Sequence, residues 1–104
     1  MAQGYQSDDR YVSAYIRARA ARGYGPERIV MELRHEGLDR ELVAQHINNS
    51  ELDWFELAHT ALSKKFGFHP AKDIKELLKR KQYLIYKGFT FSQVKILIDQ
   101  LTQE

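Results

Sequence analysis

The sequence predicts an all-α protein, an elongated array of six helices arranged as two tandem three-helix repeats. Apolar residues recur at three- and four-residue spacings along most of the chain of 104 residues, as they do on the buried face of a helix. Capping residues and glycines divide the chain into segments of helical length. No segment alternates apolar and polar residues over the length of a strand.

The first repeat is expected to hold helices over residues 10–22, 26–36 and 40–47, after a lead-in at residues 1–7. Gly23 ends the first helix and Pro26 begins the second, while Asp39 is the expected N-cap of the third. Ile29, Val30 and Leu33 form the buried face of the second helix. The first helix is expected to bury a stripe that Val12 and Ile16 widen, formed by Tyr11, Ala14, Tyr15, Ala18 and Ala21.

The second repeat is expected to begin with a helix that Ser50 or Asp53 caps and that ends at Phe66. Two more helices follow over residues 72–87 and 91–101, and Thr90-x-x-Gln93 forms a capping box before the last. The expected buried stripe of the fourth helix consists of Phe55, Ala58, His59, Leu62 and Phe66. The expected inward residues of the fifth are Ile74, Leu77, Leu78, Leu84 and Ile85.

The two halves of the chain repeat each other in sequence. Gly37-Leu38-Asp39 corresponds to Gly88-Phe89-Thr90, which lies 51 residues later. The first helices correspond at an offset of 44, because the second repeat has a longer connector and a longer middle helix. We therefore expect repeats at residues 8–49 and 50–104, stacked as in other helical arrays.

Composition excludes several kinds of function. The chain has no cysteine, which removes disulfides, thiolate chemistry and most structural zinc sites, and its histidines lack the spacing of metal ligands. No nucleophile or oxyanion-stabilising group accompanies the acidic pair Glu32 and Glu36, so we expect no enzyme. No apolar run reaches membrane-spanning length, and no signal-peptide pattern is present. We expect a cytoplasmic monomer without a cofactor, a metal, a membrane or a small-molecule substrate.

Positive charge is concentrated in one part of the chain. The window 62–87 carries a net charge of +6, whereas the whole chain carries +2. Such a region attracts polyanions or an acidic protein surface, although an ordinary solvated helix face is the alternative. The candidate partner-binding residues are Arg17, Arg19, Arg22, Arg28, Lys64, Lys65, Lys79 and Arg80.

One stretch of the first repeat resembles the signature of the bacterial RecX family: Arg22-Gly23-Tyr24-Gly25-Pro26-x-Arg28-Ile29-x-x-Glu32-Leu33-x-x-x-Gly37. The segment Gly4-Tyr5-x-x-Asp8-x-Arg10-Tyr11 is similar to the junction into that family's second repeat. Lys64-Lys65-Phe66-Gly67 and Lys87-Gly88-Phe89 are similar to its third repeat. The family usually carries three repeats, so the first is expected to be missing here, either cut away or naturally absent.

The resemblance implies a regulatory protein of DNA recombination, repair and the SOS response. RecX proteins lie in the groove of RecA filaments formed on single-stranded DNA, restrict filament growth, and inhibit the recombinase and coprotease activities. The implied partner is thus the RecA filament, and single-stranded DNA is a second candidate. The alternative function is a helical module that binds single-stranded DNA directly through its phosphates.

Overall fold

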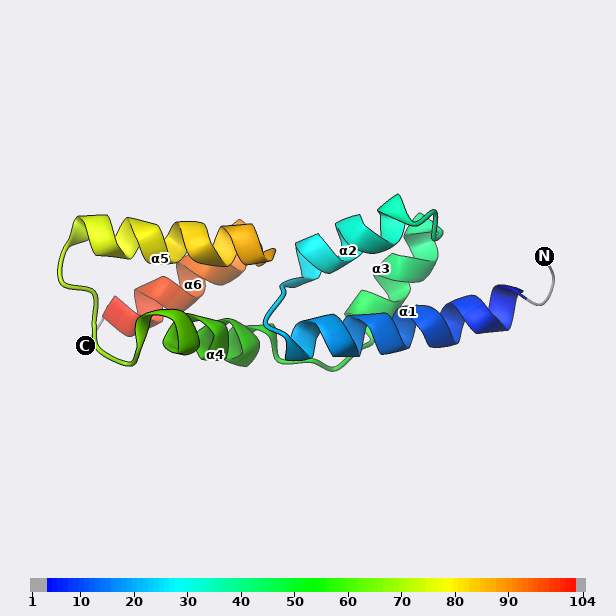
Figure 1. The fold of residues 1–104 in the computed structure, drawn as a ribbon, viewed down its shortest axis with the longest axis horizontal. Coiled ribbons are helices and arrows are strands. Elements are labelled where there is room, and N and C mark those ends of the chain that lie inside the picture. The colour runs from blue at the N-terminus through cyan, green and yellow to red at the C-terminus, as the bar shows by residue number, and fades with distance from the viewer. Residues whose placement is uncertain (1–3, 103–104) are drawn as a thin grey trace.

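The computed structural model describes residues 4–102, and the fold in that range consists of six helices with no strand (Figure 1). The prediction of an all-α fold is confirmed. The molecule is elongated, with extents of 55 × 21 × 19 Å. The helices are α1 (Gly4–Ala21), α2 (Pro26–His35), α3 (Arg40–Asn48), α4 (Trp54–Phe66), α5 (Ile74–Lys87) and α6 (Phe91–Thr102).

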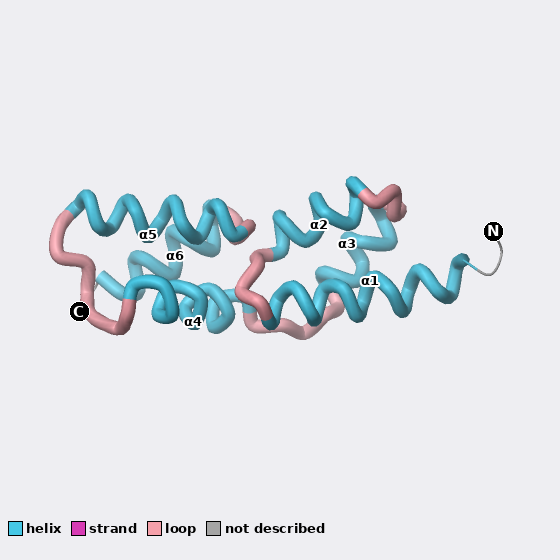
Figure 2. The backbone as a smooth tube through the Cα atoms, in the orientation of Figure 1, coloured by secondary structure: helices cyan, strands magenta, loops and turns pink. Residues whose placement is uncertain are grey.

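The helices form two three-helix units that lie one after the other along the long axis (Figures 1 and 2). Helices α1, α2 and α3 contact one another, and α4, α5 and α6 do the same. Each unit has its own apolar core, centred on Ile29 and Leu33 in the first and on Leu84 and Phe89 in the second. Trp54 and Leu57 contact both cores, so the start of α4 joins the two units.

The same backbone hydrogen bonds close the middle helix of each unit. The amide of Leu38 donates to the carbonyl of Leu33, and that of Phe89 donates to the carbonyl of Leu84, each at 3.1 Å. Gly37 and Gly88 adopt positive φ angles of 93° and 106° at these turns. The offset of 51 residues read from the sequence is therefore confirmed in the geometry.

Side-chain caps begin α3 and α4 where the sequence placed them. Asp39 accepts from the amide of Leu42 at 3.1 Å, and Asp53 accepts from that of Glu56 at 3.1 Å. Of the two candidates for the α4 cap, Asp53 is therefore the N-cap, and Ser50 instead donates to the carbonyl of Ile47. These caps satisfy amides that a helix leaves without an internal partner.

Replacing Thr90 by alanine is expected to lower the free energy of unfolding by about 1 kcal/mol. The Thr90 hydroxyl accepts from the Gln93 amide at 3.0 Å, and the Gln93 side chain accepts from the Thr90 amide at 2.9 Å. Thr90→Ala removes the first of these two bonds. Chemical denaturation of parent and variant measures the difference, and equal midpoints would show that the capping box does not stabilise α6.

The buried face of α1 differs from the predicted stripe by one position. Val12, Ile16 and Ala20 are buried, whereas Ala14 and Ala18 are exposed. Tyr11 is 44% exposed. The two tyrosines of the predicted stripe lie at the edge of this face, where Tyr15 donates to Glu32 of α2 and Tyr11 donates to Glu36, the residue after α2. The helix also begins at Gly4, earlier than residue 10.

Helix α5 also departs from prediction. It begins at Ile74 rather than at residue 72, and Ile74 and Leu78 are exposed. The side chain that replaces them inside is Arg80, which is only 5% exposed. In α4, Ala58, Ala61 and Leu62 are buried, while Phe55 and His59 of the predicted stripe are exposed.

Candidate partner-binding interface

The two units meet where the N-terminus of α2 faces the C-terminus of α5. The amide of Gly25 donates to the carbonyl of Lys87 at 2.7 Å, and the amide of Glu27 donates to that of Gly88 at 2.9 Å. Free amides at one helix end thus satisfy free carbonyls at another. A Cβ on Gly25 would lie 2.4 Å from the carbonyl carbon of Gly88. Glycine at position 25 therefore allows two backbones to touch.

The aromatic ring of Tyr24 lies among three cations at this junction. The guanidinium carbon of Arg19 and the ammonium of Lys87 each lie 3.9 Å from the ring centroid. The guanidinium carbon of Arg28 lies 4.7 Å from it. Cations at these distances are attracted by the negative face of the ring. Arg19 and Arg28 belong to the first unit and Lys87 to the second, so Tyr24 helps to hold the units together.

A single carboxylate, Glu32, balances part of this charge. It accepts two hydrogen bonds from Arg19 at 2.9 and 2.7 Å, one from Arg28 at 3.3 Å and one from the Tyr15 hydroxyl at 2.7 Å. The bonds from Arg19 are the largest cause that lowers the pKa of Glu32 below its usual value, and burial opposes them. Burial, followed by the bond to Glu32, raises the pKa of Tyr15 to about 12.

The lowered pKa of Glu32 predicts how the stability depends on pH. The unfolded chain takes up the proton first as the pH falls below 4.5, so the folded state loses stability until its own lower pKa is passed. The free energy of unfolding should therefore decrease over this acidic range, and less so in Glu32→Gln. Denaturation at a series of pH values measures this, with Glu27→Gln as the control at an exposed carboxylate. Parallel profiles for the parent and Glu32→Gln would contradict the assignment.

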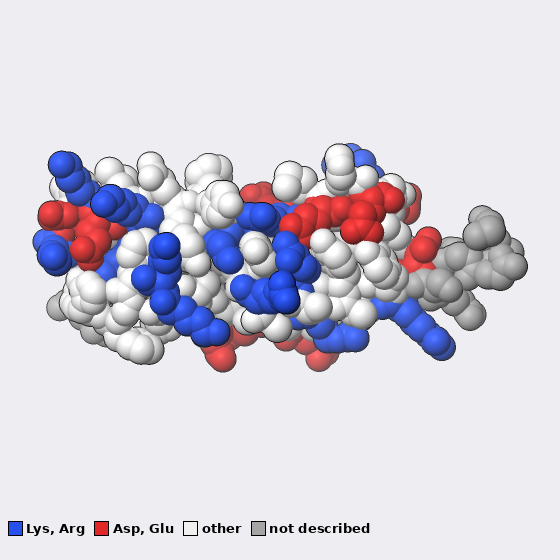
Figure 3. Space-filling model, in the orientation of Figure 1, with Lys and Arg blue, Asp and Glu red and all other residues white. Residues whose placement is uncertain are grey.

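The group of cations around Tyr24 continues along the surface as lysines of the second unit. The ammonium groups of Lys65 and Lys87 lie 5.8 and 5.9 Å from the ring centroid of Tyr83. Lys65, Tyr83, Lys87, Tyr24 and Arg19 thus alternate cations with rings from α4 to α1, and we name them the cationic row. Figure 3 shows basic side chains across the middle of the molecule. We name the basic residues at the junction of the two units the basic band: Arg19, Arg22, Arg28, Lys64, Lys65 and Lys87.

The structure brings together some of the predicted contact residues. Arg22 and Lys64, which lie 42 positions apart in the chain, line one small crevice between the units together with Lys87. Both are exposed, as are Lys65 and Arg17, and Arg17 donates to Ser13 within its own helix. Arg22, Lys64 and Lys65 therefore form the accessible edge of the basic band.

Two predicted contact residues lie elsewhere. Arg80 is buried, donates to Glu76 at 2.7 Å and has its guanidinium carbon 5.5 Å from the ring centroid of Phe66. It is part of the interior of the second unit, so its prediction as an accessible contact is wrong. Lys79 is exposed on α5 but does not line the crevice that Arg22 and Lys64 share.

Sequence reasoning missed the roles of Lys87, Tyr24 and Tyr83. Nothing in the spacing of these residues places them together, because they meet only when the units dock. One available signal was the second glycine in Gly23-Tyr24-Gly25, since Pro26 alone is sufficient to begin a helix. That glycine is required by the contact with Gly88 rather than by the turn.

Residues 4–102 offer neither a metal site nor a membrane-spanning helix. This range contains no group of His, Asp and Glu side chains that could hold a metal ion. Its helices are also too short or too polar to cross a membrane.

Comparison with known proteins identifies both units. Residues 7–47 match the model of the second three-helix domain of RecX, and residues 51–98 match that of the third. Proteins named regulatory protein RecX include one from Pectobacterium atrosepticum that is 39% identical over 92 residues, covering 88% of this chain and 56% of that protein. One from Serratia proteamaculans is 35% identical over 96 residues, covering 92% of this chain and 57% of that protein.

The chain thus spans a little over half the length of these relatives. Both of its three-helix units match the RecX models in the same order along the chain. The chain therefore belongs to the RecX family of regulatory proteins.

Proposed function

We propose that this protein binds RecA filaments on single-stranded DNA and inhibits their recombinase and coprotease activities. The observation that carries the proposal is the basic band across the junction of an elongated two-unit array. Such a band faces a long polyanionic or acidic surface better than a small ligand, because its charges are spread over several helices. Membership of the RecX family supports a regulatory role for it.

The geometry divides the basic residues into two groups. Arg19 and Arg28 are held by Glu32 and by Tyr24, so we assign them to the joint. Arg22, Lys64 and Lys65 are exposed at the edge of the band and have no ion pair within residues 4–102. We assign the contact with the filament to this second group.

Replacing Arg22, Lys64 and Lys65 together by glutamine should slow association with the filament at low salt without unfolding the protein. Rim charges act mainly on the association rate, and salt screens them over about 8 Å at physiological ionic strength. The difference from the parent should therefore shrink as salt is raised. Surface plasmon resonance on immobilised filaments measures the rates, and circular dichroism checks the fold.

A matched control is the triple variant Lys72→Gln, Lys75→Gln and Lys79→Gln, which removes the same charge from exposed positions near the start of α5. The proposal expects this control to associate almost as fast as the parent. If both triple variants slow association equally, only the net charge matters and the band is not the contact. If neither does, the basic band is a solvated surface.

The alternative function is direct binding of single-stranded DNA. One observation favours it, since the cationic row alternates rings and cations, a combination that single-stranded nucleic acid binders use. Binding to naked single-stranded DNA across a salt series separates the two functions. Similar affinity for naked DNA and for filament, with a steep salt dependence, would favour the alternative.

A further inference from the structure

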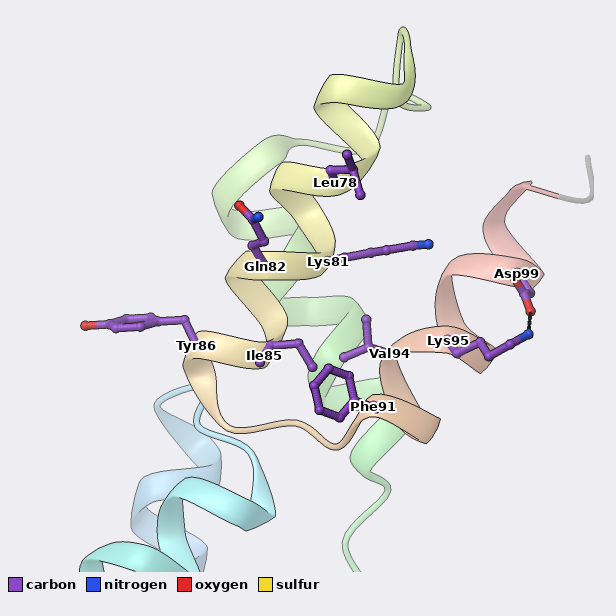
Figure 4. A pocket seen from close by; sticks show the side chains of 9 residues that line it. All are labelled: Leu78, Lys81, Gln82, Ile85, Tyr86, Phe91, Val94, Lys95 and Asp99. Carbon is purple, nitrogen blue, oxygen red and sulfur yellow. Dashed lines mark hydrogen bonds and ion pairs between the residues drawn. The ribbon is translucent and has the colours of Figure 1, made fainter.

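The second unit carries an open groove on its surface, with apolar side chains at its floor and polar ones around them. Leu78, Ile85, Phe91 and Val94 contribute to a groove of about 680 Å³ between α5 and α6 (Figure 4). Phe91 is 77% exposed and Leu78 is 49% exposed, although each is large and apolar. Large apolar side chains that are exposed together in one groove, rather than scattered singly, are a feature of interaction surfaces.

The first unit provides an internal comparison. At the established offset of 51 residues, Leu78 corresponds to Glu27 and Phe91 corresponds to Arg40, while Ile85 and Tyr86 correspond to Arg34 and His35. The same fold is therefore formed with polar residues at these places in the first unit. Folding does not require apolar residues there, so their presence in the second unit calls for another cause.

The shape and lining of the groove favour a helix as its occupant. Leu78 and Ile85 lie two helical turns apart on α5, which is about 10 Å along the axis. Helix α4 contacts both α5 and α6 and lies behind them in Figure 4, so a further helix in the groove would complete a four-helix packing. The polar side chains that line the groove are Lys81, Gln82, Tyr86, Lys95 and Asp99, and Lys95 is paired with Asp99 at 2.9 Å.

One cation indicates the charge of the occupant. The side chain of Lys81 extends from α5 across the groove toward α6 (Figure 4). It takes part in no ion pair or hydrogen bond within residues 4–102. An ammonium group beside an apolar floor is complementary to a carboxylate on a partner that is otherwise apolar at this face.

We propose that the α5–α6 groove binds an amphipathic helix of a partner protein, with the apolar face of that helix on Leu78 and Phe91 and an acidic residue facing Lys81. Helix-in-groove recognition of this kind uses apolar anchors at successive helical turns. The inference is independent of the proposed function, since the basic band lies on other residues and neither surface needs the other.

The test uses two synthetic helical peptides of about 15 residues, a length that can be stabilised as a helix. Both carry the same leucine face, and glutamates flank that face in the first peptide and lysines in the second. Fluorescence anisotropy should show that the parent protein binds the glutamate peptide more tightly. Lys81→Glu should reverse this preference, and amide shifts on binding should map to α5 and α6.

The variant Leu78→Glu with Phe91→Arg gives the groove the residues that the first unit uses, so it is expected to fold and keeps the net charge. It should bind the glutamate peptide about tenfold more weakly or worse, a loss that corresponds to about 1.4 kcal/mol. The control is Ile74→Glu, which changes an exposed apolar residue of α5 that does not line the groove. It should bind nearly as the parent does.

Three results would overturn the proposal. The first is that neither peptide binds the parent. The second is that the two peptides bind alike, or that the double variant binds as well as the parent. The third is that sedimentation shows a parent dimer that the double variant loses, in which case a second copy covers the groove. None of these measurements contains RecA or DNA, so their failure would leave the proposed function standing.

Discussion

Replacing Gly88 by alanine is expected to lower the free energy of unfolding by about 3 kcal/mol, because two independent costs add. Gly88 has a φ angle of +106°, which an L-residue with a side chain rarely adopts. A Cβ at this position would also lie 2.3 Å from the Cβ of Arg28 and 2.7 Å from its backbone nitrogen. The second cost falls on the junction, because one of the two units must move away.

The first unit supplies the control for this variant. Gly37 closes the equivalent turn with a φ angle of +93°, but a Cβ there would meet nothing within 4 Å. Gly37→Ala should therefore cost only the conformational strain, about 1 kcal/mol. Urea denaturation of both variants measures the difference. Equal destabilisation would mean that the two backbones do not touch at Gly88.

Replacing Glu76 by glutamine is expected to cost about 3 kcal/mol, since breaking one side of a buried ion pair leaves the other charge without compensation. Arg80 is 5% exposed, and its bond to Glu76 is 2.7 Å long. Its Nε is buried and makes no hydrogen bond within residues 4–102. The arginine therefore depends on Glu76 for its compensation, and thermal or urea denaturation measures the loss.

The companion double variant Glu76→Gln with Arg80→Ile, which removes both charges of the pair, should be close to the parent in stability or above it. Position 80 corresponds at the offset of 51 to Ile29, which is fully buried in the first core. Replacing a buried ion pair by a well-packed apolar residue often costs nothing. If the double variant is destabilised as much as Glu76→Gln alone, Arg80 contributes packing or hydrogen bonds beyond its pair with Glu76, which contradicts this expectation.

Short-range signals predicted the helices well. The caps at Asp39, Asp53 and Thr90 each join a side chain to an amide three residues later, so the sequence contains both partners. The glycines after α2 and α5 are equally local signals, because each takes the positive φ angle that closes its own helix. These features depend on local geometry, which is why the repeat could be recognised before the structure was known.

Features that depend on docking could not be predicted in the same way. The predicted stripe of α1 differs from the buried face by one position. The reason is that a tyrosine can lie at the edge of a core while its hydroxyl donates a hydrogen bond to a carboxylate. The sequence predicts an accessible Arg80, because arginine is rarely fully buried in proteins. Only the position of Glu76 one turn earlier, together with the correspondence to Ile29, indicated otherwise. The cationic row joins residues from both units and has no local signature.

The two backbone hydrogen bonds between the start of α2 and the end of α5 also make the coupling of the two units measurable. The amides of Gly25 and Glu27 are bonded to carbonyls of the other unit, whereas those of Val43 and Val94 are bonded within their own. In native-state hydrogen exchange, the first two lose protection whenever the units part, and the other two only when a unit itself opens. The difference between these protection free energies is the nearest-neighbour term that distinguishes a coupled array from two independent small domains.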